Sequence, residues 1–89
     1  MSAMKLTAEL SDGSIHEVEV KNPERVRWDI TRAKHNWPTA NDAPFLMTTF
    51  MAWAAMKRLG LYNGTFEDFR DNDCVDLDAE GDADDVATP

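Results

Sequence analysis

The feature that most constrains this chain is an apolar run, "PFLMTTFMAWAAM", which begins at Pro44. No charged residue occurs from Ala43 to Met56, a window of 14 residues. A helix that crosses a bilayer needs about 20 apolar residues, so this run is too short for a membrane span. Two interpretations remain: the core of a small domain, and a surface that another protein covers.

The length and charge of the chain limit what this run belongs to. The 89 residues allow one small domain of marginal stability, which often completes its apolar burial by self-association or by binding a partner. The formal net charge is −8. Residues 59–89 hold ten acidic residues and one arginine, a net of −9, which argues against general nucleic-acid binding. We expect no nucleic-acid and no membrane partner.

The single cysteine, Cys74, excludes an internal disulfide framework and fits a reducing cytoplasm. The N-terminal residues show no basic region followed by an apolar stretch, so no signal peptide is expected. The sequence therefore predicts a cytoplasmic protein.

The first part of the chain alternates between apolar and polar residues, which predicts a β-hairpin over residues 4–21. A three-residue loop, 11–13, places Leu6 opposite Val18 and keeps the apolar side chains on one face. Gly13 then takes the left-handed position that such a loop requires.

Helix signals follow the hairpin. Asn22 and Pro23 predict the start of a helix over 23–36, and Pro44 and Gly60 bound a second helix over 44–59. A short third helix is predicted over 66–71, with an extended piece near Leu77. The acid-rich segment 78–89 predicts a disordered tail. The chain is thus predicted to form one α+β domain over residues 1–77.

Helical spacing selects the core. In the first helix Val26 and Ile30 lie on one stripe, and in the second a broad apolar face includes Phe45 and Phe50. The hairpin contributes its inward apolar face. The predicted core residues are Leu6, Val18, Val26, Ile30, Phe45, Phe50, Trp53 and Met56.

Four residues fall outside this core pattern. Met47 and Met51 form a second stripe that either packs on the hairpin or contacts a partner helix, since methionine adapts its shape. Trp28 falls on the polar side of the first helix, either covered by the hairpin or tail, or acting as an interface anchor. The predicted partner-binding residues are Trp28, Arg32, Met47 and Met51.

The sequence shows few signs of a catalytic or metal-binding site. No nucleophile–base pair, phosphate-binding glycine loop or zinc-ligand spacing occurs, so we expect a non-enzyme without cofactor or metal. The run from Asp76 partly imitates a calcium loop, but Ala87 stands where a bidentate glutamate is required. Acidic neighbours disfavour a phosphate-contacting patch made of Arg25, Arg27, Arg32 and Lys34.

The segments "RVRWDITRAKHNWP", "AWAAMKRLG", "TFEDF" and "CVDLD" follow the hairpin in this order. The arrangement resembles the small tail assembly chaperones of long-tailed bacteriophages over residues 4–78. The resemblance implies several copies that bind the helical tape-measure protein and help recruit tail-tube subunits. It also implies that the protein self-associates, acts in the host cytoplasm and is absent from the mature virion. The family has no catalytic residues, and its members often have a longer form made by frameshifting.

Two other functions remain open. An acidic phage-encoded inhibitor would mimic DNA phosphates and occupy a host DNA-binding protein. A structural head–tail or tail component would instead persist in the virion. The tail 78–89 is essential only to the inhibitor, and the composition of purified virions separates the structural component from the chaperone.

Overall fold

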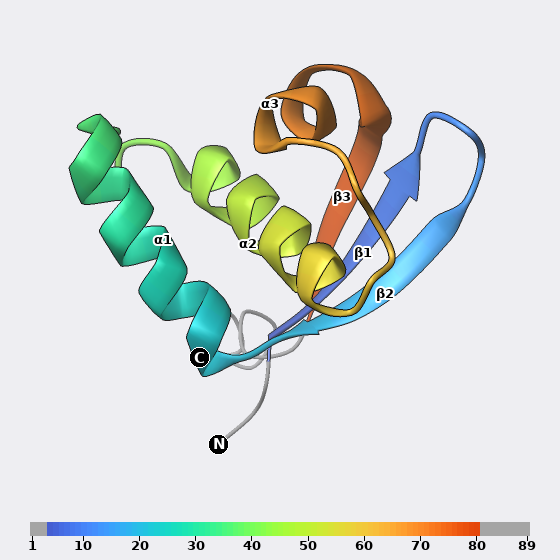
Figure 1. The fold of residues 1–89 in the computed structure, drawn as a ribbon, viewed down its shortest axis with the longest axis horizontal. Helices are drawn as coiled ribbons and strands as arrows, with labels where there is room; N and C mark the ends of the chain where they lie inside the picture. Colours follow the sequence, from blue (N-terminus) through green and yellow to red (C-terminus); the bar gives the residue numbers. More distant parts are fainter. Residues whose placement is uncertain (1–3, 81–89) are drawn as a thin grey trace, which may run out of the picture.

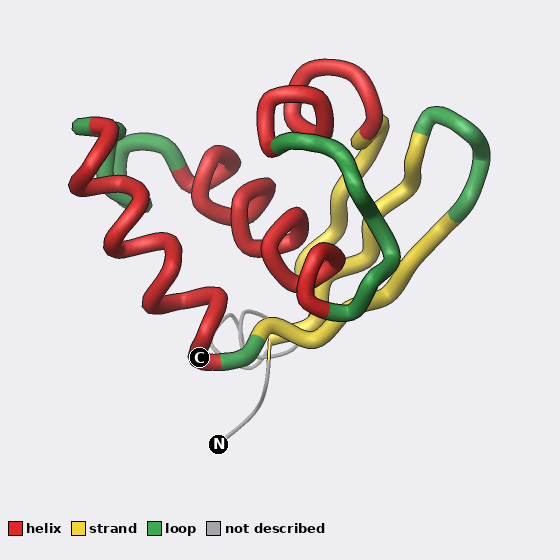
Figure 2. The backbone as a smooth tube through the Cα atoms, in the orientation of Figure 1, coloured by secondary structure: helices red, strands yellow, loops and turns green. Residues whose placement is uncertain are grey.

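A computed structural model of the chain describes residues 4–80. It has an α+β fold: helices cover one face of a three-stranded antiparallel sheet (Figure 1, Figure 2). The elements in chain order are β1 (Met4–Leu10), β2 (Ile15–Val20), α1 (Asn22–His35), α2 (Pro44–Arg58), α3 (Phe66–Asp68), a π-helical turn η1 (Phe69–Asp73) and β3 (Cys74–Glu80). The sheet order is β2-β1-β3.

The hairpin register matches the prediction. Leu6 pairs with Val18 and Ala8 pairs with His16. Gly13 has φ of 90°, and its amide donates to the Leu10 carbonyl at 2.9 Å. This register is confirmed, and it places Leu6 and Val18 on the buried face because side chains alternate along a strand.

The third strand is longer than the sequence suggested. β3 pairs with β1 as far as Glu80, opposite Lys5. The prediction that a disordered tail begins at Asp78 is therefore wrong, because the central strand β1 gains backbone hydrogen-bond partners along its second edge. Leu77 packs against the core while Asp76 and Asp78 stay exposed. Residues 81–89 of the predicted tail lie outside the described residues.

The bounds of the first two helices lie within one residue of the prediction. α1 begins at Asn22 after Lys21, whose amide donates to Glu24 Oε1 at 2.8 Å. α2 ends at Arg58, and Gly60 follows with φ of 76°. The third helix, predicted over 66–71, is a single α-helical turn that continues as η1.

The core lies between the sheet and α2. Five of the predicted core residues are buried: Leu6, Val18, Phe50, Trp53 and Met56. In α2 every residue from Phe50 to Met56 is buried, because α2 contacts the sheet, α1 and η1. Figure 1 shows α2 lying over the sheet with α1 beside it.

Three predicted core residues are exposed, so that part of the core prediction is wrong. Val26 is 46% exposed, Ile30 62% and Phe45 85%. α1 packs on α2 through Trp28, whose ring centroid lies 5.6 Å from that of Phe50. A buried tryptophan removes more apolar area from water than a valine or isoleucine, so helix α1 turns its aromatic side inward. Phe45 lies in the first turn of α2, ahead of the buried segment.

Candidate partner-binding site

The structure brings all four predicted partner-binding residues together. Trp28 and Arg32 from α1, and Met47 and Met51 from α2, line one groove of about 480 Å³. The remaining lining residues of this methionine groove are Met4, Arg25, Asp29, Thr39 and Ala40. The four residues, which are far apart in the chain, thus lie next to one another in the fold.

The floor of the methionine groove belongs to the core. Trp28 is 5% exposed and Met51 is 4% exposed. The placement of Trp28 on a polar side, and of Met51 on a stripe surplus to the core, is wrong. Because α2 is enclosed by the sheet and α1, the Trp28 and Met51 side chains fill the contacts between these elements. Met47, by contrast, is only partly buried and packs on the edge of the core.

The wall of the methionine groove carries two guanidinium groups. Arg32 Nη1 donates to the Trp37 carbonyl at 3.0 Å, which holds the Arg32 side chain across the end of α1. Arg25 lies about two helical turns before Arg32 on α1, and Asp29 is the one acidic lining residue. A methionine and tryptophan floor with a cationic wall is suited to an apolar helix that carries acidic residues along one flank.

A second groove, of about 500 Å³, shares no lining residue with the first. Its floor is aromatic, and we call it the basic groove because of its rim. Its lining residues are Arg27, Thr31, Lys34, His35, Trp37, Phe50, Trp53, Lys57, Asn63, Gly64, Thr65, Phe66 and Glu67. Sequence reasoning missed this groove, since its residues come from α1, the loop after α1, α2, the loop before α3, and α3 itself. The one available signal was the set of basic residues on α1, and the structure divides that set between the two grooves.

Several contacts hold the basic groove in shape. The Arg27 guanidinium lies 4.9 Å from the Trp53 ring centroid, and the His35 and Trp37 rings stack at 4.9 Å. Trp53 Nε1 donates to the Gly64 carbonyl at 3.1 Å, which ties the loop before α3 to α2. The floor is thus fixed by hydrogen bonds and ring contacts before any ligand arrives.

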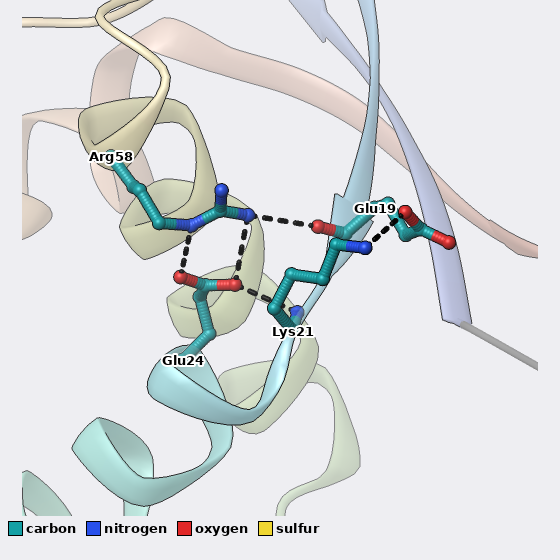
Figure 3. Close-up of polar contacts among 4 residues, drawn as sticks. All are labelled: Glu19, Lys21, Glu24 and Arg58. Carbon is teal, nitrogen blue, oxygen red and sulfur yellow. Dashed lines mark hydrogen bonds and ion pairs between the residues drawn. The ribbon is translucent and has the colours of Figure 1, made fainter.

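A polar contact joins the two helices that form both grooves. Figure 3 shows Arg58, in the last turn of α2, reaching Glu24 at the start of α1, beside the Lys21–Glu19 ion pair of 2.8 Å. Glu24 is 2% exposed. Burial alone would raise the pKa of Glu24, but hydrogen bonds from Arg58 and from the Lys21 amide outweigh it and lower the pKa below its usual value.

The described residues offer little for catalysis or metal binding. Burial, and then the charge of Asp76, raise the pKa of the Cys74 thiol, which keeps it protonated at neutral pH. Within residues 4–80 no three His, Cys, Asp or Glu side chains are grouped to hold a metal ion. Asp76 and Asp78 lie in a strand, unlike the loop of a calcium site.

No helix within the described part of the chain is long and apolar enough to span a bilayer. Comparisons with protein-family models, with curated proteins and with solved structures found no match.

Proposed function

We propose that this chain is a tail assembly chaperone of a long-tailed bacteriophage, which binds apolar helical stretches of the tape-measure protein through the methionine groove. It would act without catalysis in the host cytoplasm, help to recruit tail-tube subunits, and leave before the virion is complete. The observation that supports this most directly is the convergence of Trp28, Arg32, Met47 and Met51 on one open groove.

The shape and chemistry of the methionine groove suit a helical client. Unbranched methionine side chains adjust to different apolar surfaces, which favours a protein that must bind many positions along one long helix. Met4 and Met47 are partly buried, so each keeps surface that a client would cover. Arg25 and Arg32 would attract acidic residues beside the apolar stripe of the client.

Apolar surface elsewhere on the helices also favours a protein that works in a complex. On α1, Ile30 is 62% exposed and Val26 is 46% exposed. A small domain that leaves such side chains in water gains stability when a partner or another copy covers them. The net charge of −8 would keep separate assemblies of this protein dispersed.

The test is a pull-down of the tape-measure protein encoded in the same genome, co-produced with the full chain. We expect Met47→Asp to abolish capture, because a carboxylate in the groove would lose its hydration against the apolar client. Phe45→Asp is the matched control, with the same substitution on the same helix but outside the groove. Met51→Asp is unsuitable, since Met51 is buried and its substitution would unfold the domain.

Each outcome of this experiment supports or contradicts one part of the proposal. Capture by the Met47→Asp variant, with loss in the Phe45→Asp variant, would place the client elsewhere and overturn the methionine-groove assignment. Failure of the unmodified chain to capture the tape-measure protein would overturn the chaperone proposal itself. Detection of the chain in purified virions would favour a structural component instead. A chain without residues 81–89 that still captures the client would argue against the acidic inhibitor.

A further inference from the structure

The basic groove has a charge opposite to that of the whole protein. Arg27, Lys34 and Lys57 line it with one acidic residue, Glu67. Within residues 4–80 none of these three cations takes part in an ion pair. Cations grouped without carboxylate partners, in a chain of net charge −8, favour an acidic ligand.

The floor of the basic groove adds an apolar requirement. The Trp37 and Phe66 rings are tilted relative to each other with centroids 5.6 Å apart, and the Trp53 and Phe66 rings meet edge to face at 5.7 Å. Trp37 is only partly buried, so part of this floor is open to a ligand. The best ligand is therefore a peptide with several carboxylates and an apolar side chain among them.

The chain carries such a peptide itself. Residues 81–89 read "GDADDVATP", with three aspartates, one valine and no basic residue. We propose that the basic groove binds this acidic segment of a second copy, so that copies join head to tail. Val86 would lie on the aromatic floor, and the aspartates would meet Arg27, Lys34 and Lys57.

The position of β3 favours a contact between copies. Glu80, the last residue of β3, pairs with Lys5 next to Met4, and Met4 lines the methionine groove. β3 therefore ends near the methionine groove, while the proposed binding site is the other groove. An interface of two unlike surfaces can repeat from copy to copy and build an array.

This inference goes beyond the proposed function, because it concerns a different groove and needs no client. The test uses the full chain without any partner, in sedimentation velocity over a concentration series at low and high salt. We expect the weight-average mass to rise with concentration at low salt and the association to weaken at high salt, since screened charges attract less.

Two variants test the two sides of the proposed contact one at a time. Lys34→Glu alters the groove, and the combined Asp82→Asn, Asp84→Asn and Asp85→Asn variant alters the segment. Each alone should associate at least about tenfold more weakly than the unmodified chain. A mixture of the two should form dimers, because one variant keeps an intact groove and the other an intact segment.

Lys5→Glu is the matched control for Lys34→Glu, since Lys5 is an exposed lysine outside both grooves, and it should associate normally. Circular dichroism would verify that all variants keep their helices. A monomer at every concentration, including one whose segment folds back on its own groove, would overturn the proposal. Unchanged association of either variant, or a mixture that stays monomeric, would overturn it as well.

Discussion

Arg58 donates two hydrogen bonds to the Glu24 carboxylate, from Nε to Oε2 at 2.7 Å and from Nη2 to Oε1 at 3.2 Å. The same Arg58 Nη2 donates to the Glu19 carbonyl at 3.2 Å, so one guanidinium connects the end of α2, the start of α1 and the end of β2. Both candidate grooves lie between α1 and α2. This contact therefore helps the aromatic packing to hold together the two helices that line both grooves.

Replacing the buried carboxylate should weaken the fold. We expect Glu24→Gln to lower the free energy of unfolding by about 1–3 kcal/mol, because a neutral amide accepts more weakly from Arg58 and leaves buried donors poorly paired. Urea unfolding followed by circular dichroism measures the loss. Glu67→Gln, at an exposed position, is the control and should change little. Equal stability of both variants would show that the Arg58–Glu24 contact contributes nothing.

Acid should weaken the fold through the same carboxylate. The native pKa of Glu24 is lowered, whereas a glutamate in the unfolded chain titrates at about 4.3. The unfolded state therefore binds more protons in this range, and the stabilisation present above about pH 4.3 is lost as the pH falls through the native pKa. Urea unfolding at a series of pH values should show a shallower acid decline for Glu24→Gln. Parallel profiles for the two proteins would contradict the assigned shift.

Gly64 should not tolerate a side chain. A Cβ at this position would lie 2.7 Å from Tyr62 Cζ. The Tyr62 ring has little freedom to move, because its hydroxyl donates to Asp73 and it packs on Phe69 with ring centroids 5.2 Å apart. We expect Gly64→Ala to lower the free energy of unfolding by about 1–3 kcal/mol. In a Tyr62→Ala background the same change should cost much less, and an unchanged cost would disprove the clash.

The exposed stripe of α1 should accept polar residues. We expect Ile30→Lys to change the free energy of unfolding by no more than about 0.5 kcal/mol, since Ile30 is mostly in water. Phe50→Ala, by contrast, should cost about 3–5 kcal/mol because Phe50 is fully enclosed by other rings. Chemical denaturation compares the two. A large loss in Ile30→Lys would mean that this stripe is buried in solution, through association of copies.

The local elements of this protein could be predicted from its sequence. The alternation of apolar and polar residues around Leu6, together with the loop glycine Gly13, predicted the hairpin register correctly. A slip of one residue would turn the apolar face of the hairpin outward. The prolines at the two helix starts and Gly60 after the second helix predicted the first and last residues of both helices to within two positions. These signals act over a few residues, where backbone geometry and capping dominate.

The choice of buried face on α1 was decided only by the tertiary structure. Periodicity predicted a buried face with Val26 and Ile30 and put Trp28 on the polar side, but the packing of Trp28 against Phe50 buries the opposite face. The length of β3 was likewise decided by pairing with β1, which overcame the acidic composition of that segment. Both outcomes depend on contacts between residues far apart in the chain. Helical spacing shows which residues share a face, but not which face meets a neighbour.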